Sequence, residues 1–407
     1  MAITVKEDQH KNLLVLTPAY PNSDNSFIAE KFVKDQIAAL SPYFKNIYII
    51  APVLYSFKRY KKDKMCHDYS YDNIKVFYPR CYYIPIFYFN KILIDNRLKV
   101  VINTIEKNGL NFDVIHAHMT WPSGYIAAKL KEKYNVPSVL TIHENGDWFE
   151  EEVNMNYSLI NYAWKQNTAL IRVNRKDIPT LKKFNRNVYS IPNGYSSNYK
   201  VLDKTECRNR LDIGLDKQVL FSIGNLIERK GFNFLIDAIK HCVKTNPDIL
   251  CVIGGSGPLK DKLQKQVDGL GLNDNVIFTG FIQEEMLPVW MNACDIFVLP
   301  SLSESFGVVQ IEAMGCGKPV VATRNGGSEE IVTSDDYGLL VEPGDSQDLA
   351  DKIEIALNKE WDGEKIKQYG NNFTWENIAL QIVNVYDSAR KTYKNKKIEE
   401  ACYVHKR

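Results

Sequence analysis

The chain has 407 residues, of which 45% are hydrophobic and 25% charged, and its formal net charge is +2 at pH 7. This composition is typical of a globular protein long enough for two domains, and the charge gives no reason to expect a nucleic-acid partner. The eight cysteines show no metal-type spacing, and the N-terminus MAITVKEDQHK is too polar for a signal peptide. No apolar run approaches the roughly 20 residues of a membrane span. We therefore expect a cytoplasmic protein with reduced thiols.

Short β-branched runs alternate with amphipathic segments of helical period, which is the pattern of βαβ units. In the first half we expect strands at 12–20, 46–53, 113–118 and 137–143, and helices around 26–40 and 124–134. In the second half we expect strands at 218–225, 249–257, 275–282, 295–301, 319–323 and 338–344, and helices at 231–244, 259–270, 284–293, 305–315 and 346–359. The polar stretch 193–217 separates the halves, so we expect domains at 1–195 and 196–375. Two doubly wound α/β domains follow from this pattern.

Ligands of such sheets bind beyond the carboxyl ends of the strands, so unusual residues there indicate function. Arg229 and Lys230 follow an expected strand and precede Gly231 and a helix. Two cations beside a helix start suit a phosphate group, although solvated surface charges would look the same. The turn at Gly254 and Gly255 is weaker evidence, because many α/β connections need glycine for the bend.

The stretch LPSLSESFGVVQIEAMGCGKPVVAT, residues 299–323, places Glu304 and Glu312 eight positions apart in an apolar run. A helix capped by Ser303 or Ser305 and ending near 315–317 would separate the two carboxylates by about two turns, roughly 10 Å. That length suits a nucleoside diphosphate, with Glu312 on its ribose and Glu304 on hydroxyl groups of a sugar. The backbone N–H groups of Phe306, Gly307 and Val308 would face the phosphates. The alternative is a capping acid at 304 and a solvent-facing residue at 312.

Two other patterns have alternative interpretations. His116 and His118 in DVIHAHMTW, with His143 in TIHENGDW, have the residue type of metal ligands, but the chain has only seven histidines and no further ligand at a strand end. We therefore expect no metal site. The basic segment 54–64 and the aromatic segment 80–94 suit a contact with an anionic membrane surface, or a solvated loop followed by a buried helix.

The segment PSLSESFGVVQIEAMGCGKPVVATRNGGSEEIV resembles the donor-binding motif of the family 4 retaining glycosyltransferases, glycosyl transferases group 1, which have the GT-B fold. Further landmarks match in order: DVIHAH, IPNGY, SIGNLIERKGF, VIGGSGP, VIFTGFI, DIFVLPS and GLLVEPGD. The resemblance covers nearly the whole chain and is strongest at 193–349. It implies two Rossmann-like domains facing each other across a cleft, with a last helix at about 376–395 returning to the first domain.

Residue roles carry over from this resemblance by position. It implies that Lys230 binds the donor pyrophosphate, Glu312 the ribose and Glu304 the transferred sugar, and that His118 faces the sugar and phosphate. The donor site would also include Asn225, Arg229, Phe281, Ile282, Ser305, Phe306, Gly307 and Val308, with Phe281 and Ile282 at the base. Asn225 departs from the usual family arginine, and Arg229 is the neighbouring cation. Trp121 and His143 are acceptor-side candidates.

The resemblance implies a retaining, metal-independent hexosyltransferase without a cofactor. It would move a sugar from a UDP- or GDP-sugar to a glycan or lipid-linked saccharide in cell-surface polysaccharide or glycoconjugate synthesis. Its acceptor and the segments within 54–94 place it in the cytoplasm, at the inner face of the membrane. A sugar-nucleotide epimerase or hydrolase of the same shape, or a binding-only protein, is the alternative. The base, sugar, acceptor, linkage and oligomeric state stay open.

Overall fold

The computed structural model describes residues 11–24, 26–27, 29–55, 66–82 and 91–404. The chain divides into two compact units. Unit 1 contains Met1–Glu144, Trp148–Pro192 and Ile378–Arg407, and unit 2 contains Asn145–Asp147 and Asn193–Asn377. The structure thus divides the chain after Pro192, where the sequence suggested residue 195.

Unit 1 is an α/β unit around an eight-stranded sheet of order β10-β9-β8-β7-β1-β2-β5-β4. All neighbouring strands run parallel except β4, which is antiparallel to β5. Its strands are β1 (Asn12–Leu16), β2 (Asn46–Ile50), β4 (Tyr69–Tyr71), β5 (Ile74–Phe77), β7 (Val114–His118), β8 (Ser138–Ile142), β9 (Ala169–Arg172) and β10 (Val188–Ser190), with β3 (Val53–Tyr55) paired to β6 (Arg80–Tyr82). Its helices are α1 (Lys31–Leu40), α3 (Lys91–Lys107), α4 (Tyr125–Tyr134), α5 (Gly146–Met155), α6 (Ser158–Gln166), α7 (Ile178–Lys182) and α15 (Trp375–Val404), with the turns η1 (Ser41–Tyr43) and η3 (Thr120–Gly124).

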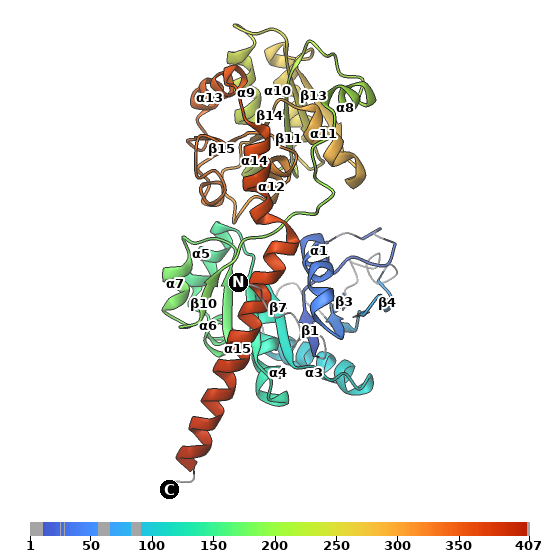
Figure 1. Cartoon of the computed structure of the whole chain (residues 1–407), viewed down its shortest axis with the longest axis vertical. Helices are drawn as coiled ribbons and strands as arrows, with labels where there is room; N and C mark the ends of the chain where they lie inside the picture. The colour runs from blue at the N-terminus through green and yellow to red at the C-terminus, as the bar shows by residue number, and fades with distance from the viewer. Residues whose placement is uncertain (1–10, 25, 28, 56–65, 83–90, 405–407) are drawn as a thin grey trace. The chain divides into compact units, whose positions relative to one another are not determined.

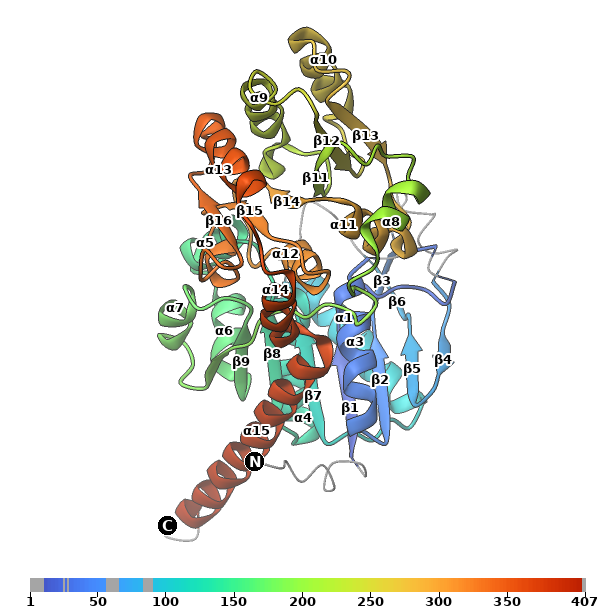
Figure 2. The same ribbon diagram turned by 45° about the horizontal axis from the view of Figure 1, so that its top comes forward.

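The centre of the unit 1 sheet is buried on both faces. Every residue of β7 and β8 is buried, as expected for central strands of a parallel sheet covered by helices. The C-terminal helix α15 runs along the β7 side of this sheet (Figures 1 and 2). Its Tyr386 hydroxyl lies 2.6 Å from Nδ1 of His116, and its ring packs edge-on against Phe44. The last segment of the chain therefore completes the core of unit 1.

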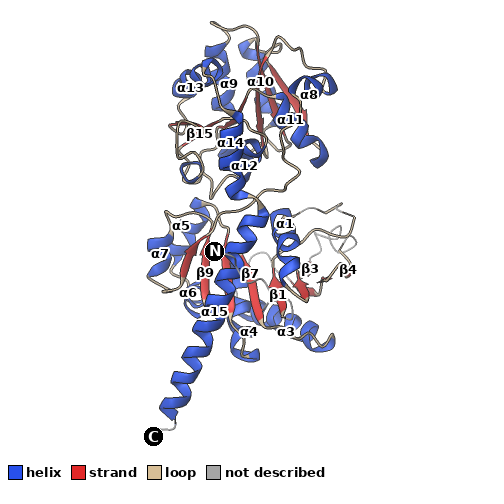
Figure 3. Cartoon of the chain, viewed as in Figure 1, coloured by secondary structure: helices blue, strands red, loops and turns tan. Residues whose placement is uncertain are grey.

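Unit 2 has a six-stranded, all-parallel sheet of order β13-β12-β11-β14-β15-β16, with helices between its strands (Figure 3). Its strands are β11 (Gln218–Ile223), β12 (Ile249–Gly254), β13 (Val276–Gly280), β14 (Ile296–Leu299), β15 (Val320–Thr323) and β16 (Gly338–Val341). Its helices are α8 (Lys204–Arg210), α9 (Phe232–Cys242), α10 (Lys260–Leu270), α11 (Leu287–Ala293), α12 (Val308–Gly315), α13 (Ser346–Asn358) and α14 (Gly363–Gly370), with the short turns η4 (Glu228–Lys230), η5 (Glu284–Met286), η6 (Ser328–Glu330) and η7 (Asn371–Phe373).

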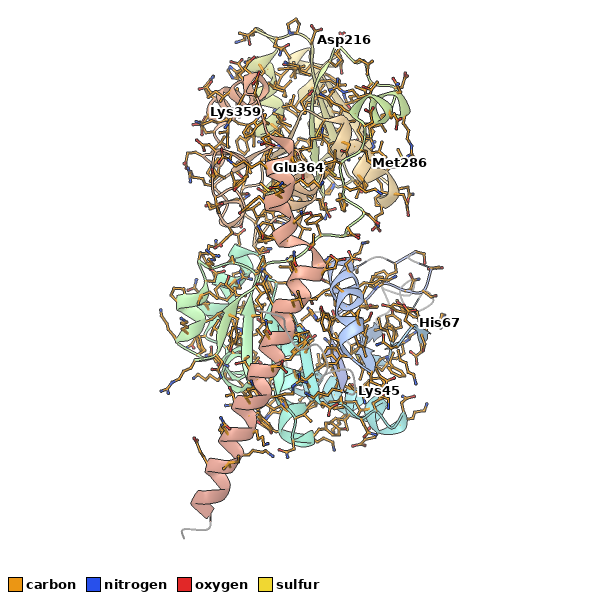
Figure 4. The ribbon with its side chains drawn as sticks, in the orientation of Figure 1. Lys45, His67, Asp216, Met286, Lys359 and Glu364 are labelled. Atoms are coloured by element: carbon orange, nitrogen blue, oxygen red, sulfur yellow. The ribbon has the colours of Figure 1, made fainter. Side chains whose placement is uncertain are left out.

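The order of the unit 2 strands reverses between β11 and β14. After β11 the chain adds β12 and β13 on one side, and then it returns to add β14, β15 and β16 on the other. Apolar side chains of α9, α10 and α13 pack on the sheet. Figure 4 draws the described side chains as sticks on the ribbon. The loops that follow β11 and β14 diverge at this switch point, where doubly wound sheets bind ligands.

The membrane contact expected for residues 54–94 falls largely on residues 56–65 and 83–90, which lie outside the described part of the chain. No helix among the described residues has both the length and the apolar character that crossing a bilayer requires.

Candidate functional site

The loops after β11 and β14 meet at the switch point of unit 2, and a glycine allows them to touch. Gly231 has a φ of 65°, and a Cβ atom there would lie 2.1 Å from the carbonyl oxygen of Pro300. The backbone N–H of Leu302 donates a hydrogen bond to the carbonyl oxygen of Arg229 at 2.8 Å. Any side chain at position 231 would push the loops apart. This close approach brings residues 229–230 beside residues 303–304.

Glu304 is a buried carboxylate between two cations. It is 8% exposed; Nζ of Lys230 forms an ion pair with its Oε1, and Nη1 of Arg229 lies 3.3 Å from its Oε2. Arg229 also donates to the carbonyl oxygen of Ser303 at 2.5 Å. Burial raises the pKa of Glu304, but the charges of Lys230 and Arg229 outweigh burial and hold that pKa below its ordinary value. The side chains of Arg229, Lys230 and Glu304 together carry a net charge of +1, which favours binding of an anionic ligand.

Helix α12 begins later than the sequence indicated. Its first residue is Val308, and Gly307 precedes it in the left-handed region with a φ of 89° and no capping side chain. The expected caps Ser303 and Ser305 are therefore wrong, because a glycine conformation starts the helix in place of a serine hydroxyl. The helix ends at Gly315, as expected. The first N–H groups of a helix have no partner within the helix, so those of α12 are available to a ligand as expected from the sequence.

The remaining donor-side candidates line neighbouring parts of unit 2. Glu312 is half-buried in α12. The pKa of the Tyr199 phenol is raised mainly by burial and further by the charge of the Glu312 carboxylate. Phe306 is buried, and Gly327 packs so closely against its backbone nitrogen that a Cβ would lie 2.6 Å away. Ser305 is half-buried between Glu304 and Phe306. Glu312 thus has a tyrosine neighbour that local sequence did not indicate.

The ends of β11, β12 and β13 form an adjoining surface. Asn225 is exposed after β11, and Gly255 approaches Gly224 so closely that a Cβ there would lie 2.0 Å from its carbonyl oxygen. After β13, Phe281 is 60% exposed, whereas Ile282 is buried over Gly254. The structure thus gathers Arg229, Lys230 and Glu304 into one cluster and leaves the Phe281 ring accessible two strands away.

In unit 1 the three candidate histidines are buried at the carboxyl ends of β7 and β8. Both ring nitrogens of His116 are paired, Nδ1 with the Tyr386 hydroxyl and Nε2 with Oγ1 of Thr141 at 2.7 Å. Burial lowers its pKa to about 3, so it is a neutral packing residue. Nδ1 of His118 lies 3.0 Å from Nε2 of His143, and burial first, then the two neighbouring histidines, hold the His118 pKa well below its ordinary value.

Trp121 is buried in the core of unit 1, with its ring 5.8 Å from that of Tyr125. The role suggested for Trp121 on the acceptor side stays a prediction. Among the described residues, no three or more His, Cys, Asp or Glu side chains are grouped so that they could hold a metal ion.

A buried acidic pair beside the histidines was missed by sequence reasoning. Oε1 of Glu144 accepts a hydrogen bond from the backbone N–H of Thr120 at 2.6 Å, directly after the β7 end. Glu152 is fully buried, and its pKa is raised to about 9 by burial and then by the charge of Glu144. The guanidinium of Arg172 donates to the Glu144 carbonyl oxygen at 2.7 Å and pairs with Asp177. In the sequence these glutamates belong to the acid-rich run HENGDWFEEE, whose composition is typical of a solvent-exposed segment.

Several known proteins are similar to this chain. Residues 203–373 match the family described as Glycosyl transferases group 1, and residues 59–196 match Glycosyltransferase Family 4. An uncharacterized glycosyltransferase of Methanocaldococcus jannaschii is 30% identical over 308 residues, which cover 72% of this chain and 79% of that protein. The mannosylfructose-phosphate synthase of Agrobacterium fabrum is 28% identical over 323 residues, 69% of each chain.

Two solved structures have the same fold. The sucrose-phosphate synthase of Thermosynechococcus elongatus superposes with a TM-score of 0.71 at 21% identity, covering 93% of this chain and 99% of that one. Anabaena HepE in complex with UDP gives a TM-score of 0.69 at 24% identity, covering 93% of this chain and 100% of that one.

Proposed function

This chain belongs to the group 1 glycosyltransferases of family 4, and we propose that it moves a hexosyl group from a UDP- or GDP-sugar to a glycan or lipid-linked saccharide. The expected GT-B fold is confirmed, since both units are parallel-sheet α/β units and the two solved structures described above have that fold. A nucleotide-sugar donor is supported by HepE, which was crystallised with UDP and with UDP-glucose.

The cluster of Arg229, Lys230 and Glu304 at the switch point carries the proposal. Breaking the bond between a sugar and a nucleoside diphosphate leaves negative charge on the distal phosphate. Lys230 and Arg229, already ordered by Glu304, and the N–H groups at the start of α12 would stabilise that charge without rearranging. We therefore propose a metal-independent reaction in which these groups supply the positive charge.

In a retaining reaction Glu304 is better suited to position other groups than to attack the sugar as a nucleophile. Its carboxylate is ionised and held by two cations, which lowers its tendency to attack a sugar carbon. We propose that it fixes the cations and accepts hydrogen bonds from sugar hydroxyl groups. The departing phosphate would then take the proton of the acceptor hydroxyl on the same face of the sugar.

We propose that unit 1 binds the acceptor. We assign His118 to the transferred sugar, with His143 as its buried neighbour, and the acceptor to the edge of the sheet beyond β1 and β7. We further propose cytoplasmic action at the inner face of the membrane in cell-surface polysaccharide or glycoconjugate synthesis, with contact through residues 54–94. Liposome pelleting with Lys58, Arg59, Lys61 and Lys62 neutralised tests that contact, and unchanged pelleting would overturn it.

The central test is incubation with UDP- and GDP-sugars, with and without a polyprenyl-linked or glycan acceptor. We expect transfer with retained anomeric configuration, unaffected by EDTA, and a large loss of turnover in Lys230→Gln. Lys262→Gln removes the same charge from an exposed lysine of α10 and serves as the matched control. Formation of a 2-epimer would show an epimerase. Tight donor binding with no turnover would show a binding protein.

A further inference from the structure

A cavity of about 350 Å³ lies in unit 1, at the carboxyl ends of β1 and β2. Its walls are the segments that follow these two strands, together with side chains of α3 and of the loop before α1. The lining that matters for its chemistry is Tyr20, Phe27, Glu30, Pro52, Tyr78 and Arg97. None of the candidate site residues discussed above lines this cavity. Its volume falls in the range of small-molecule sites, about 300–1,000 Å³.

Among the described residues that line the cavity, Arg97 is the one cation, and it is half-buried. Its neighbour is the buried thiol of Cys81, whose pKa is raised by burial and partly lowered again by the Arg97 charge. In the described part of the chain no carboxylate forms an ion pair with Arg97. Glu30 lines the same cavity. A guanidinium that has lost part of its water without gaining a counter-ion favours an anion with planar, paired oxygens.

Two tyrosines of the lining are held in place by hydrogen bonds. Tyr20 and Tyr78 are buried and anchored by hydrogen bonds, Tyr20 to the Tyr71 hydroxyl at 2.7 Å and Tyr78 to the carbonyl oxygen of Pro21 at 2.7 Å. Because these hydrogen bonds fix both tyrosine side chains, this wall of the cavity loses little conformational entropy when a ligand binds. Glu30 adopts the left-handed conformation, with φ 55° and ψ 39°, which places it at the start of α1 and on the cavity wall.

We infer that this cavity binds an oxyanion of the acceptor, a phosphate or a carboxylate, through Arg97. The inference rests on the proposed function, because it names the kind of acceptor that unit 1 takes. The oxyanion can belong to the phosphate of a lipid carrier, to a soluble sugar phosphate or to a uronic acid, and these sources share the same chemistry at Arg97.

Binding of inorganic phosphate to the full chain tests the cavity without an identified acceptor. Titrations are made in the Lys230→Gln background, so that phosphate binding at the unit 2 cluster is weakened. We expect Arg97→Gln to reduce phosphate affinity about tenfold, and Arg97→Lys to recover part of it. Arg210→Gln removes the same charge from an exposed residue at the end of α8 and should leave the affinity unchanged. Equal affinities in Arg97→Gln and Arg210→Gln would overturn the inference.

Transfer assays then distinguish the three sources of the oxyanion. The acceptors are a polyprenyl diphosphate-linked sugar, a hexose phosphate and a glucuronide, each paired with its uncharged analogue. For the acceptor that is used, Arg97→Gln should raise the acceptor KM about tenfold and leave the donor KM and donor hydrolysis by water unchanged. An unchanged acceptor KM contradicts the inference while leaving the transferase proposal standing. Absence of any transfer by the unaltered protein contradicts the proposed function, and the phosphate titration still decides the role of Arg97.

Discussion

The Glu144 side chain accepts a hydrogen bond from the backbone N–H of Thr120, one residue after Met119 adopts a φ of 70° and a ψ of 139°. This backbone conformation is uncommon for any residue with a Cβ and costs of order 1–3 kcal/mol. The strained residue immediately follows His118. A buried carboxylate beyond the end of the neighbouring strand therefore holds the turn that follows the candidate histidine.

Replacing Glu144 should release this turn. In Glu144→Ala the buried N–H of Thr120 loses its acceptor, so we expect a loss of about 1–3 kcal/mol in the free energy of unfolding and a fall in kcat. Glycine adopts a positive φ without strain, so Met119→Gly in the same chain should restore part of the lost kcat. Urea unfolding and steady-state kinetics of both variants measure this. If Met119→Gly restores none of the kcat, the turn does not position His118.

The acidic pair makes stability depend on pH. The folded-state pKa of Glu152 is raised to about 9, so its contribution to stability is complete below its ordinary value, 4.5, and is lost as the pH rises toward 9. Glu152→Gln abolishes this titration, so we expect the variant to gain about 1–3 kcal/mol relative to the unaltered protein between pH 5 and pH 8. Urea unfolding at the two pH values measures the gain. Glu151→Gln, exposed beside it on α5, should show no such gain.

Of the two candidate glutamates of unit 2, Glu304 should mainly affect turnover and Glu312 should mainly affect nucleotide affinity. Glu304→Ala removes the partner of Lys230 and Arg229, so we expect turnover to fall more than the affinity for UDP or GDP. Glu312→Ala should weaken nucleotide affinity about tenfold through the lost ribose contact. Calorimetric titration with each nucleotide and measurement of kcat separate the effects. Full activity in both variants would mean that neither carboxylate meets the donor.

Phe281 offers a test of base binding that does not disturb the fold. Its ring is 60% exposed after β13, so Phe281→Ala should leave the free energy of unfolding nearly unchanged. If the ring stacks on the nucleobase, the affinity for UDP or GDP should fall by about 1–3 kcal/mol. Ile277→Ala, on another partly exposed residue of β13, is the control. A Phe281→Ala variant with unchanged affinity would place the base elsewhere.

Unit 2 was predicted well from sequence because its strands are apolar runs bounded by glycine or proline. All six lie within the expected ranges, from β11 at Gln218–Ile223 to β16 at Gly338–Val341. In unit 1 the short strands β5 and β9 carry a lysine and an arginine, and they depend on pairing with distant strands. The periodic pattern does not detect such segments.

The candidate site residues also differ in whether local sequence predicts them. Arg229, Lys230 and Glu304 belong to motifs that local sequence displays, and the topology of the sheet then brings them together. Glu144 and Glu152 lie in an acid-rich run, and their burial depends on α5 packing over strand ends that local sequence does not specify. The start of α12 was misplaced because a left-handed glycine replaced the serine cap.

The hydrogen bond between His116 and Tyr386 joins residues 270 positions apart. On a ribosome that adds about 5–20 residues per second, β7 emerges roughly 10–60 s before the helix that covers it. All of unit 2 is translated in that interval. During biosynthesis the nascent first unit must therefore wait with an uncovered sheet face, and a chain released before Tyr386 leaves the buried imidazole of His116 without its phenol.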